Sequence, residues 1–297
     1  MKILLLGKNG QVGWELQRSL APLGELLALD RHGDQDLCGD LSDLDKLATT
    51  VRAVQPQVIV NAAAYTAVDQ AESEATQAQR INAEAPAVLA REAKTCGALL
   101  LHYSTDYVFD GSGQRPWRED DATGPLSVYG RTKLDGEQAV VDSGCAHLIL
   151  RTSWVYAARG GNFARTMLRL AGERERLTVI DDQWGAPTGA ELIADVTAHA
   201  IAQMRQQPAK GGIYHLAAAG ETSWHGYAQH VIGQARQLRP AIELKVREIA
   251  PIPTSQYPTP ARRPHNSRLD CSKLQAAFDL RLPPWQDGVR RLLTEIL

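Results

Sequence analysis

The stretch KILLLGKNGQVG, residues 2–13, decides the fold of this chain. Its apolar run does not alternate with polar residues, which is typical of a strand covered on both faces in a parallel sheet. Gly7, Gly10 and Gly13 follow at intervals of three. At a turn into a helix, glycine lets a pyrophosphate approach the backbone, and the first N–H groups of the helix bind its charge. We therefore predict a strand, a glycine turn and a helix that bind a dinucleotide.

Short apolar runs and helix-like stretches alternate through the first half of the chain. The predicted strands are residues 2–6, 25–29, 58–61, 99–104 and 147–151, and the predicted helices are residues 12–23, 44–54, 67–80, 83–96 and 127–143. Strands and helices in this order, joined by right-handed crossovers, form a doubly wound parallel sheet. The predicted fold class is therefore α/β with a Rossmann-type sheet.

The alternation becomes irregular after about residue 155, which indicates a smaller C-terminal substrate-binding lobe. Helices are predicted at residues 162–173, 191–206, 224–237 and 285–296, strands at 177–180, 212–216 and 242–246, a loop at 181–189 and a proline-rich run at 249–264. We expect residues 1–156 to form a dinucleotide-binding domain, with 190–217 returning to it. Residues 157–189 and 218–297 are expected to form the substrate-binding lobe.

The composition argues against several classes of partner. Lys and Arg number 32 against 34 Asp and Glu, so the chain has no basic excess for nucleic-acid phosphates. It contains no run of about eighteen apolar residues that could cross a membrane. Its four cysteines show no CxxC spacing, which suits ordinary thiols in a reducing compartment. We expect a cytoplasmic protein without nucleic-acid or membrane partners.

Candidate cofactor contacts lie where predicted strands end. Asp30 closes the second strand, at the place expected for an acid that binds ribose hydroxyls, which favours NADH. Arg31 follows it and could pair with a 2′-phosphate, so NADPH remains open. The other candidates are Asn9, Gln11 and Val12 in the glycine turn, Gly39, Asp40 and Leu41 near the adenine, and Ala62, Ala63, Ala64 and Tyr65 after the third strand. For the alanines, packing between helix and sheet explains the small side chains equally well.

A second motif, YGRTK at residues 129–133, carries acid–base chemistry. Tyr129 and Lys133 are four residues apart and therefore share one helical face. A free phenol has a pKa of about 10, and a nearby ammonium would lower the pKa of Tyr129 towards the range for proton transfer at neutral pH. Ser104 and Thr105 end a predicted strand, where a hydroxyl can hydrogen-bond a reacting carbonyl. Each motif alone is more often structural, but together they predict hydride transfer with tyrosine as the acid.

Further motifs narrow the family. HYSTDYVFDG at residues 102–111, RTSWVY at 151–156, DQWGAPT at 182–188 and RPHNSRL at 263–269 accompany the glycine turn and the YxxxK motif. In this order they resemble the extended short-chain dehydrogenase/reductase superfamily and, from residue 1 to 297, its dTDP-4-dehydrorhamnose reductase family. The resemblance implies hydride transfer from NADPH or NADH to C4 of a nucleotide-sugar substrate, dTDP-4-dehydro-β-L-rhamnose. The product, dTDP-L-rhamnose, would feed surface polysaccharide synthesis.

The resemblance also implies roles for individual residues. Tyr129 would protonate the new alkoxide, Thr105 would polarise the carbonyl, and Lys133 would hold the cofactor ribose and tune Tyr129. The implied sugar-nucleotide pocket contains Ser104, Thr105, Tyr129, Trp154, Asn162 and Arg263. Some reductases of this family pair as dimers around a divalent cation, and the matching carboxylates here are Glu15, Glu191 and Glu295. A homodimer bridged by Mg²⁺ is one expectation, and three solvated surface glutamates are the other.

Two other functions remain open. One is a sugar-nucleotide 4-epimerase or 4,6-dehydratase on the same fold. A dehydratase resembling this chain would carry an acidic pair after the threonine, whereas here Asp106 is followed by Tyr107. The other is a non-catalytic subunit that resembles these reductases and regulates methionine adenosyltransferase. The presence of Thr105, Tyr129 and Lys133 together favours a working enzyme.

Overall fold

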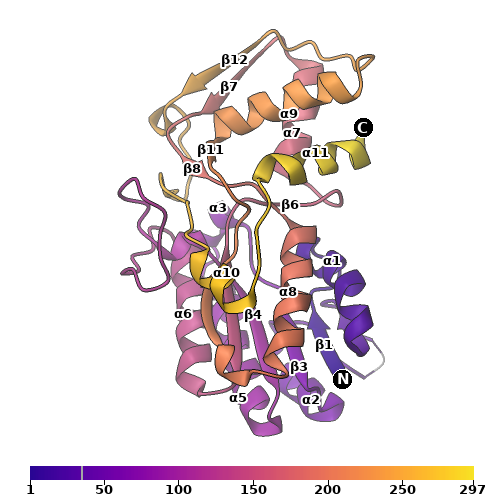
Figure 1. Ribbon diagram of the computed structural model, residues 1–297. Helices are drawn as coiled ribbons and strands as arrows, with labels where there is room; N and C mark the ends of the chain where they lie inside the picture. Colours follow the sequence, from indigo (N-terminus) through magenta and orange to yellow (C-terminus); the bar gives the residue numbers. More distant parts are fainter. Residues whose placement is uncertain (35) are drawn as a thin grey trace.

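A six-stranded sheet forms the centre of the computed structural model, which describes residues 1–34 and 36–297 (Figure 1). The strands stand in the order β10-β5-β4-β3-β1-β2. Their bounds are β1 Lys2–Leu6, β2 Glu25–Leu29, β3 Val58–Asn61, β4 Leu99–Thr105, β5 His147–Thr152 and β10 Gly212–His215. Every neighbouring pair runs parallel, which confirms the predicted α/β, Rossmann-type fold. The winding direction changes between β1 and β3, and such sheets bind ligands at the carboxyl ends of the strands there.

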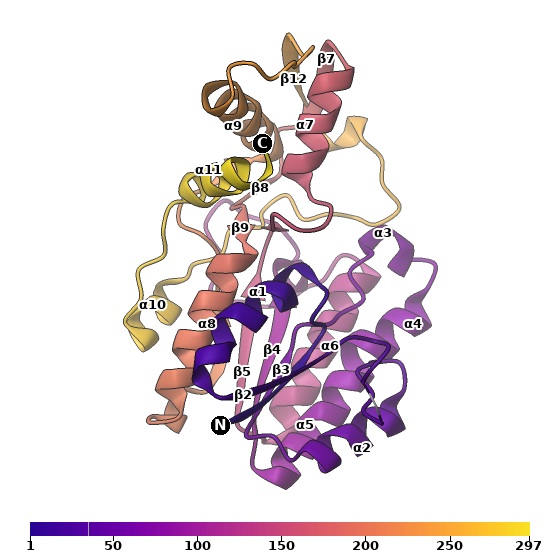
Figure 2. The same cartoon turned by 90° about the vertical axis from the view of Figure 1, so that its right-hand side faces the viewer.

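Helices cover both faces of the sheet (Figure 2). The helices α1 (Gln11–Leu20) and α8 (Ala190–Met204) pack on one face, and α2 (Leu44–Val54), α5 (Ala85–Cys96) and α6 (Val128–Ser143) pack on the other. Ile3 and Leu5 belong to the apolar core on the first face, whereas Leu4 and Leu6 belong to the core on the second. Successive strand residues point to opposite faces, so a strand between two helix layers needs apolar residues at every position.

The upper lobe has an apolar core of its own. Three helices, α7 (Phe163–Glu173), α9 (Trp224–Leu238) and α11 (Trp285–Ile296), pack with the parallel strands β7 (Arg176–Ile180) and β12 (Glu248–Ile252). Tyr227, Val231 and Val289 are fully buried in this core. Two short strand pairs lie where the lobe meets the sheet: β6 (Val155–Tyr156) with β9 (Thr188–Gly189), and β8 (Trp184–Gly185) with β11 (Thr222–Ser223).

Several elements differ from the prediction. The strand expected at residues 242–246 lies instead at β12, inside the expected proline-rich run. Pro251 is tolerated there because β12 is an edge strand with a single neighbour. The helix expected at residues 67–80 is divided into α3 (Val68–Ala71), α4 (Ala75–Gln79) and a π-helical turn at Arg80–Glu84. The expected loop at 181–189 contains β8 and β9, and the helix α10 (Ser272–Phe278) has no counterpart in the prediction. Short 3₁₀ turns lie at Ala21–Leu23, Asp106–Val108, Pro208–Lys210 and Thr254–Gln256.

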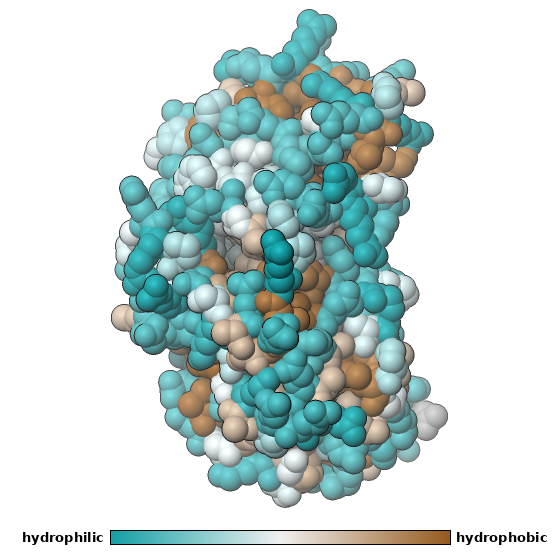
Figure 3. Space-filling model, in the orientation of Figure 1, coloured by the Kyte–Doolittle hydropathy of each residue, from teal (hydrophilic) through white to brown (hydrophobic). Residues whose placement is uncertain are grey.

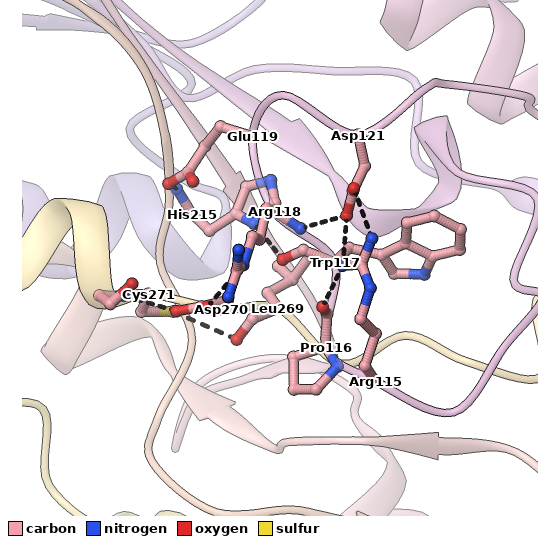
Figure 4. Close-up of polar contacts among 11 residues, drawn as sticks. Arg115, Pro116, Trp117, Arg118, Glu119, Asp121, His215, Leu269, Asp270 and Cys271 are labelled. Carbon is pink, nitrogen blue, oxygen red and sulfur yellow. Dashed lines mark hydrogen bonds and ion pairs between the residues drawn. The ribbon is translucent and has the colours of Figure 1, made fainter.

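The loop after β4 is bound to a C-terminal segment, residues 263–270, which we call the strap (Figure 4). The Trp117 N–H donates to the Arg268 carbonyl at 2.8 Å, and the Asp270 N–H donates to the Trp117 carbonyl at 2.8 Å. The same carbonyl lies 3.0 Å from Nδ1 of His215 in β10. Since β10 is an edge strand of the sheet, the strap joins the sheet, the loop and the lobe.

The surface carries no extended apolar face in the view of Figure 3. That face is mainly hydrophilic, and its hydrophobic residues form small separate patches. In the part of the chain that the structure describes, no helix is both long enough and apolar enough to cross a membrane. The four cysteines are free thiols, as their spacing predicts.

Candidate active site

The glycine turn after β1 leaves almost no room for side chains. Gly7 has a φ of +89°, a backbone conformation that L side chains rarely adopt. A Cβ atom on Gly13 would lie 2.0 Å from the Gly7 carbonyl oxygen, whereas one on Gly10 would approach that oxygen only to 3.4 Å. Gly10 precedes α1, and no side chain caps the start of this helix. The first N–H groups of α1 can therefore bind an anion, and the turn fits a pyrophosphate.

Asp30 lies beside this turn, directly after the end of β2. Its Oδ2 accepts a hydrogen bond from Asn9 Nδ2 at 2.7 Å, and its Oδ1 accepts one from the His32 N–H at 2.9 Å. Lys8 Nζ lies 3.9 Å from Asp30 Oδ2. The next residue, Arg31, is exposed. A carboxylate suited to ribose hydroxyls and a cation suited to a 2′-phosphate thus occupy neighbouring positions.

Several other cofactor candidates have structural roles. Leu41 is buried in the core beneath α2, and Val12 packs against the core beneath α1. Asp40 Oδ1 accepts two hydrogen bonds of 2.8 Å from the backbone and hydroxyl of the serine two residues later. Gly39 is required because a Cβ atom there would lie 2.2 Å from a carbonyl oxygen at the end of β2. The Tyr65 N–H donates to an asparagine side chain at 2.9 Å.

The end of β3 touches the glycine turn. A Cβ atom on Gly7 would lie 2.8 Å from Ala63 N, so glycine at position 7 lets the backbones at the ends of β1 and β3 approach closely. Gln11 extends in the other direction, and its Nε2 donates to the Gly161 carbonyl at 2.7 Å. Gly161 lies just before α7, so this hydrogen bond connects the glycine turn to the upper lobe.

Tyr129 and Lys133 project from the first turns of α6. The Ser127 hydroxyl caps this helix by accepting a hydrogen bond from the Gly130 N–H at 3.2 Å. A Cβ atom on Gly130 would lie 2.3 Å from the Tyr107 carbonyl oxygen. Glycine at this position therefore lets α6 lie against the chain that follows β4, which brings the two candidate catalytic side chains to the end of that strand.

Thr105 ends β4 and is buried. Its Oγ1 donates to Asp106 Oδ1 at 3.0 Å and accepts a hydrogen bond from the Tyr107 N–H at 3.2 Å. The Tyr107 ring packs edge-on against the Tyr129 ring, with 5.5 Å between centroids. Burial raises the pKa of the Tyr129 phenol, and the neighbouring Thr105 hydroxyl opposes this rise. The structure therefore brings Thr105 and Tyr129 together.

Burial dominates the protonation of the candidate acid and base. It raises the pKa of Tyr129 to about 12 and lowers the pKa of Lys133 to about 8. Lys133 Nζ donates to the Tyr103 carbonyl at 2.6 Å and lies 3.2 Å from His102 Nε2. The expected lowering of the tyrosine pKa by the lysine is therefore wrong for this structure, because the Lys133 amine is directed to β4 rather than to the phenol.

The expected substrate contacts come from both parts of the molecule. Ser104 Oγ is buried and has no hydrogen-bond partner among the residues described. Trp154 has a φ of +48° and stacks on Trp224, with 3.6 Å between ring centroids. Arg263, in the strap, donates to Asp69 Oδ2 at 2.8 Å. A hydroxyl, an aromatic surface and a guanidinium are thus available from β4, the lobe and the strap.

Asn162 has a local structural role. Its Oδ1 accepts a hydrogen bond from the Arg165 N–H at 3.1 Å, which caps α7. Its Nδ2 donates to the Ala157 carbonyl at 2.7 Å. Both ends of the amide therefore bind the chain of the lobe itself, and Asn162 shapes the loop before α7.

Glu15, Glu191 and Glu295 line one small cavity together with Arg291. Burial raises the pKa of Glu191, and the Arg291 charge opposes this rise. Arg291 Nε also donates to Glu295 at 3.2 Å. Within residues 1–34 and 36–297, no group of three His, Cys, Asp or Glu side chains is arranged to hold a metal ion. One chain thus brings these carboxylates to one place without forming a metal site.

Three buried polar residues near the site are not among the predicted site residues. Asn61, His102 and Asp106 are 1%, 1% and 2% exposed. Asn61 of β3 stands opposite His102 of β4 in the sheet register. Burial raises the pKa of Asp106 to about 6. The available signal was a polar residue inside an apolar strand, as in VIVN and LLLH, since a doubly covered strand seldom tolerates one without a partner.

Comparison with known proteins identifies the family. Residues 1–297 match the family model described as RmlD substrate binding domain. The dTDP-4-dehydrorhamnose reductase of Shigella flexneri is 58% identical over 100% of this chain and 98% of its own length. Solved dTDP-4-dehydrorhamnose reductases of Clostridium acetobutylicum and of Bacillus anthracis, the latter in complex with NADP, are 33% and 32% identical. Both align with a TM-score of 0.86 over 98% of each chain. The chain therefore belongs to the dTDP-4-dehydrorhamnose reductase family.

Proposed function

We propose that Thr105, Tyr129 and Lys133 carry out the reduction of the C4 ketone of dTDP-4-dehydro-β-L-rhamnose to dTDP-L-rhamnose. The activity follows from family membership, since relatives of that name are 58% identical over the whole chain, and the protein is an oxidoreductase that uses NADPH or NADH. The observation that carries the residue assignment is that Tyr107 contacts both residues at the carboxyl end of β4: its N–H donates to Thr105 Oγ1, and its ring packs against the Tyr129 ring. Ligands of doubly wound sheets bind at that end.

The glycine turn supports binding of NADPH or NADH. The nicotinamide cofactor supplies the hydride when it is bound. The turn would hold the pyrophosphate, which a Cβ atom on Gly13 would obstruct. Asp30 would bind ribose hydroxyls, and Arg31 would bind the 2′-phosphate of NADPH. Lys133 would hold the nicotinamide ribose close to Tyr129.

Tyr129 is suited to donate a proton rather than to remove one. Its pKa of about 12 keeps the phenol protonated at neutral pH. Hydride addition turns the ketone oxygen into an alkoxide, which is more basic than a phenolate and takes the Tyr129 proton. Thr105 would turn its one hydroxyl proton from Asp106 Oδ1 to the same oxygen and hold that oxygen within reach of the phenol. Lys133 would act on the cofactor ribose rather than on the phenolate, because its amine is directed to β4.

The lobe and the strap would select the sugar nucleotide. Ser104 Oγ is free of partners within the described chain and could bind a sugar hydroxyl. The stacked Trp154 offers an apolar wall, and Arg263 offers a charge for the diphosphate. Asn162 would act indirectly by fixing the loop before α7. These positions support a division into a dinucleotide-binding domain and a substrate-binding lobe made of residues 157–189 and 218–297.

We further propose that the enzyme works in the cytoplasm, because sugar nucleotides and reduced nicotinamide cofactors are metabolites of that compartment. A homodimer through the surface around Glu15, Glu191 and Glu295 is part of the proposal. Apposed carboxylates repel unless a cation or proton intervenes. Arg291 lines the same cavity and supplies one positive charge per chain, so Mg²⁺ would be needed only for the charge that Arg291 leaves unbalanced.

A comparison of wild type with Tyr129→Phe tests the assignment. The loss of NADPH or NADH absorbance would be followed with the dTDP-4-keto-6-deoxy sugar as substrate. We expect a loss of at least ~10²-fold in kcat, the low end for removal of a general acid. Tyr214→Phe is a suitable control, since this tyrosine lies in β10, on the edge of the sheet. Its hydroxyl donates to the Lys210 carbonyl at 2.9 Å.

Other outcomes separate the remaining functions. Full activity of Tyr129→Phe would contradict the proposed acid. NAD⁺ retained tightly by the purified protein, with turnover that needs no added NADPH or NADH, would favour an epimerase or dehydratase. Copurification with a larger catalytic protein and no NADPH oxidation would favour a regulatory subunit.

A further inference from the structure

Lys133 ends a row of hydrogen-bonded, buried polar side chains whose other two members have no part in the reduction scheme above. Asn61 of β3, His102 of β4 and Lys133 of α6 are 1%, 1% and 2% exposed. His102 Nδ1 lies 3.2 Å from Asn61 Nδ2, and His102 Nε2 lies 3.2 Å from Lys133 Nζ. Each buried polar atom needs a partner of the right polarity. The positions of the hydrogens in this row can therefore be derived.

The Asn61 amide sets the direction of the row. Its Oδ1 accepts a hydrogen bond from the Ala63 N–H at 3.3 Å, so its NH₂ group faces His102. An amide NH₂ group only donates, and His102 Nδ1 must therefore accept. Burial holds the pKa of His102 well below its usual value, and a charged Lys133 would lower it further. The ring is neutral, and its single N–H is on Nε2.

This Nε2–H points at the Lys133 amine. A neutral amine has a lone pair that can accept the hydrogen bond, whereas an ammonium has only donors. With the ammonium, two N–H groups would oppose each other across 3.2 Å. Lys133 can donate to the Tyr103 carbonyl at 2.6 Å in either form. The donor and acceptor directions of these hydrogen bonds therefore favour one protonation state of Lys133, the neutral amine.

We propose that His102 is a positioning residue for the reduction, whose Nε2–H, oriented by Asn61, favours the neutral amine of Lys133 over the ammonium. This inference rests on the proposed role of Lys133. Its effect adds to burial, which lowers the pKa of Lys133 to about 8. Lys133 therefore loses its charge within the range in which enzymes work, and the contact with His102 would lower the pH at which this happens.

The other groups around Lys133 do not cancel this effect. Glu137, one turn further along α6, raises the pKa of Lys133. Its carboxylate is itself bound by Arg151 of β5 through hydrogen bonds of 2.9 and 2.6 Å, which neutralise much of its charge. Tyr129 and Tyr103 have raised pKa values and stay neutral at the same pH. His102 is thus the neighbour whose hydrogen bond suits the neutral amine of Lys133 and opposes the ammonium.

The tautomer of His102 provides a direct test in the wild-type protein. Long-range ¹H–¹⁵N NMR spectra of the histidine rings show which ring nitrogen carries the proton. We expect a neutral His102 with its proton on Nε2, assigned by the signals that disappear in His102→Gln. A proton on Nδ1, or on both nitrogens, overturns the proposal. If His102→Gln does not fold, the remaining histidines can be assigned by substitution and His102 by elimination.

The pH dependence of kcat tests the consequence for catalysis. A glutamine at position 102 can turn its Oε1 towards Lys133 and accept a hydrogen bond from the ammonium. We expect the alkaline limb of the kcat profile to move up by about one pH unit, the size expected when one donor is exchanged for an acceptor. The control is His215→Gln, because this buried histidine contacts Trp117 and should leave the limb in place.

The two possible failures can be told apart. An alkaline limb at the same pH in folded His102→Gln and in wild type overturns the positioning role of His102. Full activity of Tyr129→Phe would overturn the proposed function instead, whatever the tautomer of His102.

Discussion

The buried side chains around β4 and those of the upper lobe are held in different ways. Around β4, several polar groups are bound by specific partners, as in the Arg151–Glu137 pair with its two short hydrogen bonds. In the lobe, Trp224 stacks on Trp154 with 3.6 Å between ring centroids and packs against Phe163 at 4.7 Å. Hydrogen bonds fix atoms in direction, whereas stacked rings fix only a surface.

This difference indicates how the two regions divide the work. Proton transfer depends on the position of single atoms, so the residues that would perform it lie on the sheet and α6. Recognition of a sugar needs a wall of the right shape, which stacked rings supply. Changes around β4 should therefore affect stability and protonation sharply, whereas changes in the lobe should affect mainly substrate affinity.

The largest effect should come from breaking the buried ion pair below the site. In Arg151→Met, Glu137 remains buried without its partner, which should lower the free energy of unfolding by about 3–5 kcal/mol. The matched control is Arg115→Met, since Arg115 also binds a carboxylate through two hydrogen bonds but is 62% exposed. Its loss should be below about 1 kcal/mol. Urea unfolding measures both variants. Equal losses of unfolding free energy in Arg151→Met and Arg115→Met would contradict the contrast between a buried and an exposed ion pair.

The next effect concerns Asp106, whose carboxyl pKa is raised to about 6 in the folded protein. Between about pH 4 and pH 6 the folded protein therefore binds more protons than the unfolded chain, and stability falls as pH rises through this window. Asp106→Asn should be more stable than wild type at pH 7 by about 2–3 kcal/mol, and the difference should vanish near pH 4. Thermal unfolding across this range measures it, and a difference that grows towards low pH contradicts the sign.

The glycine turn should show a smaller effect with a sharp positional contrast. A Cβ atom on Gly13 would lie 2.0 Å from the Gly7 carbonyl, so Gly13→Ala should disturb the turn at a cost of about 1–3 kcal/mol and weaken NADPH binding. A Cβ atom on Gly10 would keep 3.4 Å from that oxygen, so Gly10→Ala should leave unfolding unchanged. Calorimetric titration with NADPH and thermal unfolding of both variants measure this. Equal destabilisation would contradict the argument.

The smallest effect should come from the aromatic wall of the lobe. Trp154→Leu removes one face of the stack with Trp224, and the loss of such a contact is worth about 1 kcal/mol. KM for the sugar nucleotide should rise about fivefold, while kcat stays within about twofold of wild type. Steady-state kinetics provide both values. A fall in kcat as large as that of Tyr129→Phe would mean that the lobe takes part in the chemistry.

The sheet was predictable because its signals are local. The uninterrupted run at residues 3–6 and the glycines after it determine β1, the turn and α1, and the structure confirms all three. Tyr129 and Lys133 do lie on α6, as their spacing predicts. The lobe was harder, since β12 contains Pro251 and pairs with a strand about seventy residues away. No local pattern indicates such a pairing.

The electrostatics of the site could not be predicted from spacing. A spacing of four residues places Tyr129 and Lys133 on one face, but the direction of the lysine amine depends on His102 and the Tyr103 carbonyl. Those partners come from β4 and are known only once the sheet packs against α6. Burial, which decides both pKa shifts, is likewise a property of the assembled layers.

The position of β10 has a consequence for biosynthesis. This strand pairs with β5, yet residues 153–211 separate the two in the chain. The strap that binds the neighbouring loop begins only at residue 263. While the chain leaves the ribosome, the open edge of β5 must wait for the first part of the upper lobe and α8 to be translated. An unpaired strand edge invites contact with other nascent chains. The protein should therefore depend on chaperones most during synthesis of its middle third, and least after residue 270 has emerged.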